Sequence, residues 1–538
     1  MGFYNISLNN TDEKILKMNS SLSKLLKVNH LRYTNIRFGF RIAEIRIEID
    51  DTLNNNEIEL PNFIVEKLKI PLDCQYSILL KDNELIFGPF IGIFLGARES
   101  VVLKKLRFLN SYVLKYNEIN GVIFAFTLEN LNKADLLVDG YFYNPKQDIW
   151  EKATLPYPAS IYKRSPFSLE LREYFGTFYG NKIFNYNTFD KWNMYNRLEQ
   201  FPEALELLPR TVLYQDSHNM LEFINTYNDV YIKPIDGKKG LGIFNLVKEA
   251  DTFYVRTREK EGNIEWEFKT EVELADFMNM KLAESEYIMQ NTIDININQK
   301  VLDIRVGMDK DQHGEWNNIM FVSRVSGENS IVSNRAVSGG EIQRVSDVLR
   351  SIYGYSEDKV QYYEDELVRN AKLVAELLER TGLNLGKLAF DFVIDKDGKI
   401  WIIEINSRYP DDSLANKIGE KDVYFDIHHT NIMYTKHLAG FGEQGNDILF
   451  NFSFPNDNTK KRYKLTIAIP VKEKNNLIEK IKQQFQKRGL PEEVTYNTTI
   501  KKVEVELEGT RQQLYHFIDD IKVGTEHRKK SIISVQEL

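Results

Sequence analysis

Two carboxylates and a carboxamide occupy alternate positions of a predicted β-hairpin near residue 400. The segment LAFDFVIDKDGKIWIIEIN (388–406) contains Asp397–Gly398, a dipeptide that favours a two-residue hairpin turn. That turn places Asp391 opposite Glu404, and because side chains alternate along a strand, Asn406 shares their face. A longer turn would shift the register by two and keep all three on one face.

The hairpin should bury one face and bring the acids together on the other. We expect the core face to carry Phe390, Phe392, Ile394, Trp401, Ile403 and Ile405. The acids would share their face with Val393 and Ile402, which argues against the alternative of a solvent-exposed surface. Facing carboxylates repel unless a cation lies between them, and oxygen ligands favour a hard cation, Mg²⁺ or Mn²⁺.

A glycine-rich loop is the second candidate for chemistry. It lies within VYIKPIDGKKGLGIFNLV (230–247), between two β-forming runs, with Lys233 on the preceding strand. The loop itself holds Gly237, Lys238, Lys239, Gly240 and Gly242. It matches neither GxxxxGK[ST] nor a GxGxxG that opens a helix. We therefore predict a strand–loop–strand flap that holds phosphates with amides and lysines; a flexible hairpin with solvated lysines is the alternative.

Cationic and polar side chains follow between these two motifs. Arg305 lies in the alternating strand pattern LDIRVGM and Arg324 in FVSRVSG. An arginine on a cleft strand suits bidentate contact with phosphate or carboxylate, although a surface ion pair would explain each arginine alone. Asn334 lies in the polar loop SNRAVSGGE, which could complete the wall of a site.

The elements that carry these residues suggest a multidomain chain of the α+β and α/β classes. Four domains are expected: an N-terminal arm with a small β-rich domain (1–88), an α/β domain (89–201), the section with the chemistry (202–445) and a ferredoxin-like module (446–538). Residues 1–28 are polar enough to form a loosely attached arm. The α/β domain alternates strands and helices, with KIFNYN (182–187) as one expected strand.

Composition limits the partners and the compartment. The chain has 538 residues, 70 basic and 78 acidic side chains and a formal charge of −8, which argues against nucleic acid as main partner. Cys74 is its only cysteine, so no internal disulfide is expected. The start lacks a signal-peptide pattern, and the apolar run 86–97 is too short to span a bilayer. We expect a cytoplasmic protein without a membrane partner.

The ordered motifs resemble a known superfamily. Lys191, LPRT, YIKP with its flap, YIMQ, DIRV, SRV with SNRAVSGGE, FDF and WIIEIN are similar to the ATP-grasp superfamily, especially its RimK-like branch of glutamate ligases. GPFIGIFLG, LPYPASIYKRSP, DIRVGMDKDQHGEW and the hairpin are similar to the YheC/YheD endospore coat-associated family. The likeness covers roughly residues 40 to 440 and leaves out the C-terminal module.

The resemblance implies ATP and Mg²⁺ (or Mn²⁺) as cofactors, and a role for each matching residue. The phosphates would be held by Lys191, Lys233 and the flap of Gly237, Lys239, Gly240 and Gly242; the adenine by Met289 and Gln290; the metal by Asp391, Glu404 and Asn406; the transferred phosphoryl group by Arg305, Arg324 and Asn334. Gln290 stands where many relatives have glutamate. The strand 286–293 that contains YIMQ could link two lobes and pair its backbone with adenine.

The implied activity is an ADP-forming carboxylate–amine ligase that makes an amide through an acyl phosphate, on an amino-acid or peptide substrate. A non-catalytic spore-coat scaffold that keeps the ATP fold and an ATP-grasp phosphotransferase are the alternatives. The C-terminal module could bind a protein partner or form a homodimer. Association with the forming spore coat would fit the family.

Overall fold

The computed structural model describes residues 2–237, 241–259, 262–295, 302–325 and 341–442, and the backbone of four strands between 461 and 537. The contacts divide the chain into two compact units. One comprises residues 1–172 and 181–448, and the other comprises residues 173–180 and 449–538. Among the described residues, no helix is long and apolar enough to cross a membrane.

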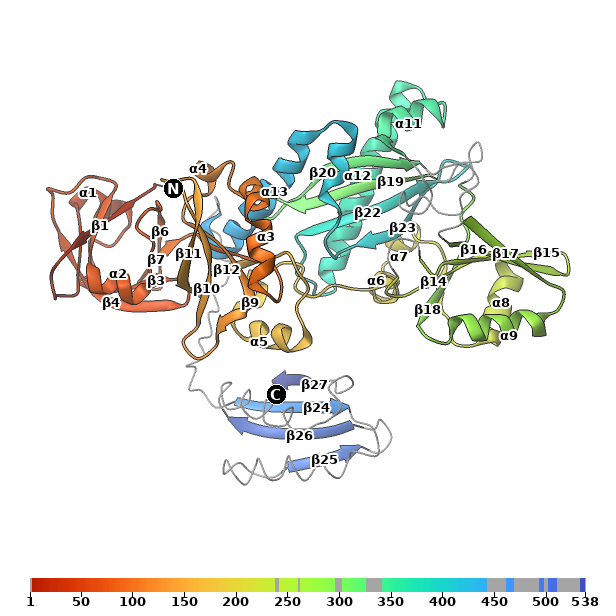
Figure 1. Cartoon of the computed structure of the whole chain (residues 1–538), viewed down its shortest axis with the longest axis horizontal. Helices are drawn as coiled ribbons and strands as arrows, with labels where there is room; N and C mark the ends of the chain where they lie inside the picture. Colours follow the sequence, from red (N-terminus) through yellow and green to blue (C-terminus); the bar gives the residue numbers. More distant parts are fainter. Residues whose placement is uncertain are drawn as a thin grey trace. The chain divides into compact units, whose positions relative to one another are not determined.

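The N-terminal residues build a seven-stranded sheet of order β1-β5-β2-β4-β3-β7-β6 (Figure 1). Its elements are β1 (Asn5–Asn9), β2 (Ile15–Met18), α1 (Ser20–Leu25), β3 (Tyr33–Phe38), β4 (Arg41–Ile49), β5 (Glu57–Pro61), α2 (Asn62–Leu68), β6 (Ser77–Lys81) and β7 (Glu84–Gly88). The expected loose arm over residues 1–28 is wrong: β1 pairs with β5 and β2 with β4, both in parallel. Leu16 and Met18 are fully buried, so these long-range partners fix a segment that is polar on average.

A mixed five-stranded sheet of order β11-β10-β9-β8-β12 follows. It comprises β8 (Phe90–Phe94), β9 (Val122–Asn132), β10 (Leu137–Asn144), β11 (Ile149–Pro156) and β12 (Ser160–Lys163), with helices α3 (Glu99–Leu109), α4 (Tyr116–Ile119) and α5 (Leu169–Tyr179). The expected strand at 182–187 does not form; a short 3₁₀ helix, Gly180–Lys182, ends there. Ile432 and Leu438, from the far end of the unit, complete this core.

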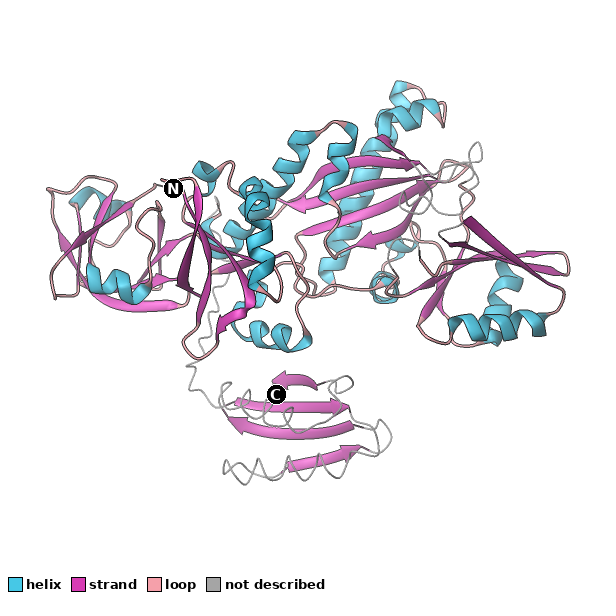
Figure 2. Ribbon diagram, in the orientation of Figure 1, coloured by secondary structure: helices cyan, strands magenta, loops and turns pink. Residues whose placement is uncertain are grey.

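The candidate site lies between two further sheets. The first has the order β13-β18-β14-β15-β16-β17 and carries α8 (Ser217–Tyr227) and α9 (Glu271–Leu282) side by side on one face (Figure 2). Its strands are β13 (Thr211–Leu213), β14 (Asp229–Pro234), β15 (Phe244–Glu249), β16 (Thr252–Glu259), β17 (Gly262–Phe268) and β18 (Tyr287–Asn291). One apolar cluster, which includes Leu246 and Met278, joins sheet and helices.

The second sheet has the order β21-β20-β19-β22-β23. Its strands are β19 (Leu302–Lys310), β20 (Trp316–Val325), β21 (Glu341–Arg344), β22 (Lys387–Ile394) and β23 (Ile400–Asn406), with α6 (Lys191–Leu198), α7 (Pro202–Leu205), α11 (Val345–Ser351), α12 (Glu357–Arg380) and α13 (Lys421–Lys436) around it. The apolar stripe of the amphipathic α12, with Leu367, Ala371 and Leu378 fully buried, packs on the Phe390 and Phe392 face.

The C-terminal unit contributes four antiparallel strands, β24 (Lys461–Ala468), β25 (Glu493–Asn497), β26 (Lys502–Gly509) and β27 (Ile533–Glu537). Their order, β25-β26-β24-β27, is the order of a ferredoxin-like sheet. The rest of this segment lies outside the described residues, so the ferredoxin-like module stays a prediction.

Candidate functional site

The carboxylate hairpin pairs Asp391 with Glu404 as expected, but its turn is longer than expected and one strand contains a bulge. Asp391 is the partner of Glu404, and Ala389 is the partner of Asn406. The turn, however, runs over residues 395–399 and Ile394 pairs with Ile400, which shifts the register by one. A β-bulge between Asp391 and Phe392 on one side and residues 402–404 on the other restores it.

The bulge also exchanges two side chains relative to the expected faces. Ile402, expected beside the acids, is 1% exposed in the core with Phe390 and Phe392. Ile403, expected in the core, lines a pocket with two lysines, Lys191 and Lys233. The extra residue reverses strand parity at this point, and alternation alone does not predict such a reversal.

Asp391 is the buried centre of an ion-pair network. Its two oxygens accept from Nε and Nη2 of Arg305, both at 2.7 Å, and Oδ2 also accepts from Nη2 of Arg324 at 2.7 Å. Nε of Arg324 donates to Asp303 at 2.6 Å. Burial alone would raise the pKa of Asp391, but the two guanidiniums outweigh it and hold the pKa below its ordinary value.

Asp303 was not foreseen in the sequence analysis, although the sequence contains a signal for it. In LDIRVGM it stands two residues before Arg305, so both side chains lie on the same face of β19. Arg305 is the register partner of Asp391, and Arg324 is the partner of Asp303. Both predicted arginines therefore meet the hairpin, each paired with a buried acid.

Lys191 connects the hairpin to the glycine-rich loop. It is the first residue of α6, whose start is capped by Asp190 through the amide of Asn193 at 2.7 Å. Its ammonium lies 3.1 Å from the carbonyl oxygen of Gly237 and 3.5 Å from Oε1 of Glu404. One cation thus contacts both motifs that the sequence analysis singled out, from sheets on either side of the site.

Lys233 lies beside Lys191 in the same pocket. Its Nζ donates to Oε1 of Gln290 at 2.6 Å, and Nε2 of Gln290 donates to Thr211 at 2.9 Å. Burial lowers the pKa of Lys233 to about 8; Glu404 opposes this shift and Lys191 adds to it. The pocket is lined by Lys191, Met194, Tyr195, Leu208, Thr211, Lys233, Ile288, Gln290 and Ile403. Apolar side chains thus surround two cations and an amide, which are groups of the kinds that contact phosphates and bases.

The expected adenine contact needs correction at Met289. Its side chain is fully buried in the core of the six-stranded sheet, whereas its neighbours Ile288 and Gln290 line the pocket. Its backbone lies between β13 and β14, with Val212 and Ile232 as register partners. β18 is therefore an interior strand, and Met289 does not present an edge to a ligand.

The glycine-rich loop is described at both of its ends. A Cβ at Gly237 would lie 2.4 Å from Cγ of Pro234, so this glycine allows the turn to close on the proline. Gly242 has φ +71°, in the left-handed region. The predicted Lys239 and Gly240, and Asn334 of the second loop, lie outside the described residues.

The oxygen atoms around Glu404 are of the kind that bind a hard cation. Glu404 is 37% exposed, and the Nδ2 of Asn406 donates to Asp391 at 3.4 Å, which leaves the amide oxygen as its possible ligand atom. Asp391 can ligate only by sharing an oxygen with a guanidinium. Within the described ranges, three or more His, Cys, Asp or Glu side chains do not cluster as a metal site, so phosphate oxygens and water would complete the shell.

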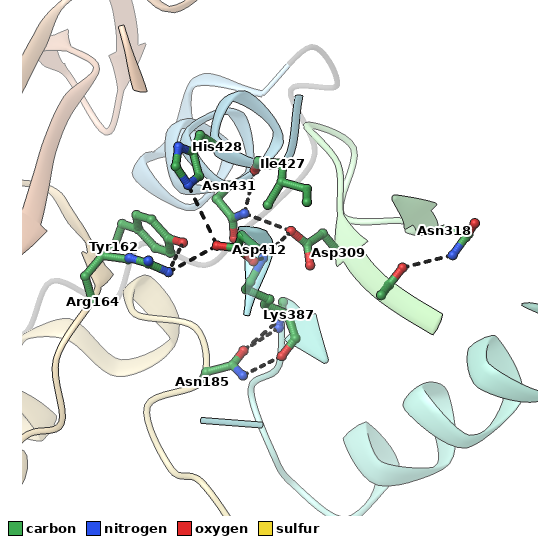
Figure 3. A network of polar contacts seen from close by, with 12 residues as sticks. Tyr162, Arg164, Asn185, Asp309, Asn318, Lys387, Asp412, Ile427, His428 and Asn431 are labelled. Carbon is green, nitrogen blue, oxygen red and sulfur yellow. Dashed lines mark hydrogen bonds and ion pairs between the residues drawn. The ribbon is translucent and has the colours of Figure 1, made fainter. Parts of the chain in front are cut away.

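A second buried network holds the loop that follows the hairpin (Figure 3). Lys387 pairs with Asp309 at 3.0 Å and with Asp412 at 2.9 Å, and Asp412 also lies 3.4 Å from Nη1 of Arg164. Nδ2 of Asn185 donates to the carbonyl oxygens of Lys387 and Ser407, at 2.6 and 2.9 Å. These contacts fix the residues directly after Asn406 to β12 and β22.

The two sheets on either side of the site, the glycine-rich loop and the carboxylate hairpin together indicate the class of the protein. Residues 180–438 match the family model described as "YheC/D like ATP-grasp". This part of the chain is therefore an ATP-grasp domain, as its motifs predicted.

Curated relatives give the particular family. Endospore coat-associated protein YheD of Bacillus subtilis (strain 168) is 27% identical over 75% of this chain and 89% of its own length. YheC of the same strain is 24% identical over 53% of this chain and 79% of its own. The chain is thus similar to the YheC/YheD proteins, and its residues 180–438 match the model of that ATP-grasp family.

A solved structure with a similar arrangement is the VanG D-Ala:D-Ser ligase from Enterococcus faecalis, 10% identical, which covers 65% of this chain and 98% of its own with a TM-score of 0.38. A likeness this low adds nothing to the assignment, which rests on the family model and the two relatives.

Proposed function

We propose that the chain is an ATP-dependent, ADP-forming carboxylate–amine ligase that acts on an amino-acid or peptide substrate. The single observation that carries the proposal is the position of Lys191. Its ammonium contacts both the Gly237 carbonyl and Glu404, which supports a single site built from the glycine-rich loop and the carboxylate hairpin. The guanidiniums of Arg305 and Arg324 lie on the neighbouring strands of that site.

In the proposed reaction, an oxygen of the substrate carboxylate attacks the γ-phosphorus of ATP, and the bond to the bridging oxygen breaks to release ADP. An amine nitrogen then attacks the acyl carbon, phosphate leaves with the C–O bond's electrons, and the amine loses a proton. Lys191 and Lys233 would hold the phosphates. The Nη1 groups of Arg305 and Arg324, which their pairs with Asp391 do not use, would bind the transferred group.

Glu404 and Asn406 would hold Mg²⁺ (or Mn²⁺), with Asp391 as a shared ligand. The ion, when bound, neutralises phosphate charge. The apolar pocket wall of Ile288 and Ile403 would exclude water, whose attack on an acyl phosphate competes with the amine.

The test is ADP release from the full chain, screened with pools of amino acids and peptides, with amide product identified by mass. Glu404→Ala should abolish turnover at an unchanged thermal midpoint. Glu357→Ala, which removes a 73% exposed carboxylate from the first turn of α12, is the matched control and should keep full turnover. Full turnover in Glu404→Ala would contradict the metal assignment.

The same experiment separates the two alternatives. A phosphotransferase would release ADP without any dependence on an added amine, and its product would be a phosphorylated acceptor. A non-catalytic scaffold would bind nucleotide without releasing ADP from any pool. Because the relatives are named for the endospore coat, we propose that this chain also associates with the forming coat.

A further inference from the structure

A group of basic side chains, which we call the basic cluster, lies beside the candidate site without taking part in it. It consists of Lys163, Arg164, Arg172 and Arg408, which come from the end of β12, from α5 and from the loop after β23. Tyr409 lies among them: the ammonium of Lys163 is 5.9 Å from its ring, and Arg164, Arg172 and Arg408 all act on its hydroxyl electrostatically.

The charges of the basic cluster are only partly compensated. Arg164 faces Asp412 at 3.4 Å, and Arg408 reaches the 72% exposed Asp236 at 3.0 Å. Within the part of the chain that the structure describes, no carboxylate pairs with Lys163 or with Arg172.

Lys163 is 7% exposed, and among the described residues its Nζ donates to two backbone carbonyls, those of Asn185 at 2.5 Å and Tyr186 at 3.2 Å. Burial, together with the nearby charges of Arg172 and Arg408, lowers its pKa to about 7. A buried ammonium without an anion is costly, and a bound anion would offset that cost.

Two polar atoms of the same region are buried without a partner among the described residues. They are Nε of Arg172 and the hydroxyl of Tyr409. Tyr409 also has φ +51°, in the left-handed region that a bulky residue rarely adopts. Such backbone strain and such unpaired donors are common where a ligand completes the structure.

The position of the basic cluster relates it to the transferred group. Arg408 follows Asn406 by two residues, which spans about 7 Å in extended chain. Its Nη1 contacts Asp236, the residue directly before Gly237 of the phosphate loop. Exposure falls from Arg408 (43%) over Arg164 (25%) to Lys163, so the cluster runs inward from the surface beside the hairpin.

We propose that the basic cluster binds a second carboxylate of the substrate, and that the substrate is therefore an acidic peptide. The inference rests on the proposed ligase only for naming the bound peptide a substrate. Planar guanidiniums suit carboxylates because they can donate two parallel hydrogen bonds. A chain with a net charge of −8 repels polyanions in general, so a specific binder needs such a local concentration of cations.

Binding of fluorescein-labelled hexa-L-glutamate to the full chain, followed by fluorescence anisotropy, tests the proposal. Hexa-L-glutamine is the neutral probe, and its affinity should be at least tenfold weaker. Arg172→Gln should weaken hexaglutamate binding about tenfold, the order expected of a lost charge-assisted pair. Arg369→Gln, which removes the same charge from the exposed face of α12, should leave it unchanged.

Tyr409→Phe separates ligand binding from folding. Loss of an unpaired buried hydroxyl should keep or raise the thermal midpoint, whereas affinity for hexaglutamate should fall several-fold. Equal affinity for both probes, an equal loss in Arg369→Gln, or competitive displacement of the peptide by AMP-PNP would overturn the proposal, the last because the cluster would then belong to the phosphate site. ADP release with neutral peptides alone would overturn this inference and leave the ligase standing. Hexaglutamate binding without any ADP release would overturn the proposed ligase activity and leave the acidic-peptide site standing.

Discussion

Asp391 should be the residue on which the stability of the ATP-grasp core depends most. It is 1% exposed and accepts three guanidinium hydrogen bonds at 2.7 Å. Asp391→Asn keeps the shape but removes the charge, which leaves Arg305 without a carboxylate among the described residues, while Arg324 keeps Asp303. Removal of one partner of a buried ion pair costs about 3–5 kcal/mol, and because the amide oxygen still accepts, we expect about 3 kcal/mol.

The assay is urea unfolding followed by tryptophan fluorescence, with Asp365→Asn on the exposed face of α12 as the matched control. Combining Asp391→Asn with Arg305→Met should cost less than the sum of the single changes, by about 1–3 kcal/mol, because the two residues share one interaction. The contribution of Asp391 to the free energy of unfolding should be present at pH values above the ordinary carboxyl pKa. It should disappear as the pH falls through the lowered pKa of Asp391. If Asp391→Asn stays within about 0.5 kcal/mol of the wild type, the guanidiniums do not depend on this carboxylate and the reasoning is wrong.

Three further outcomes are expected. With the pKa of Lys233 at about 8, nucleotide affinity measured by calorimetry should stay constant below pH 8 and fall by up to tenfold per pH unit above it. Lys233→Met should remove this pH dependence. The same pH dependence in the variant would refute a role of Lys233 in nucleotide binding. Burial raises the pKa of Asp309 to about 6, so its stabilising contribution is complete below its ordinary pKa of 3.8 and is lost as the pH rises through 6. As the pH rises from 4 to 7, the free energy of unfolding of Asp309→Asn should therefore increase by about 3 kcal/mol relative to that of the wild type, which thermal midpoints can follow. A stability difference between the two proteins that does not change with pH would contradict this. Gly237→Ala must displace the turn, since its Cβ would lie 2.4 Å from Pro234; nucleotide affinity should fall at least tenfold, and a wild-type value would mean that the loop tolerates the shift.

The sequence by itself predicted most residues of the candidate site and the ATP-grasp class of residues 180–438. Alternating strands place Asp391, Glu404 and Asn406 on one hairpin, and Arg305 on a strand of matching pattern, because alternation is a local property of a strand. The strand–loop–strand form around Gly237 and Gly242 likewise follows from which residues flank the glycines. The same local reasoning could have added Asp303, which stands two residues before Arg305.

Only the tertiary structure decided what these residues contact. A five-position turn and a bulge cancel one another, so Asp391 still faces Glu404 while Ile402 and Ile403 exchange faces. Protein cations also contact the acids, which the sequence did not predict: Arg305 and Arg324 pair with Asp391, and Lys191 contacts Glu404. Pairing between strands far apart in sequence sets such contacts, and no local pattern records it.

The same limit explains the other differences. The first 28 residues look polar on average, yet β1 and β2 are held by parallel partners more than 25 residues away. Met289 looks like part of an adenine strand until β13 and β14 are seen on both of its sides. The basic cluster joins Lys163 and Arg408, which are remote in the chain and meet because buried ion pairs around Lys387 bring the loop after β23 against β12. Local sequence determines which residues form a strand and which side chains share a face. Packing between segments far apart in the chain determines which residues those side chains contact.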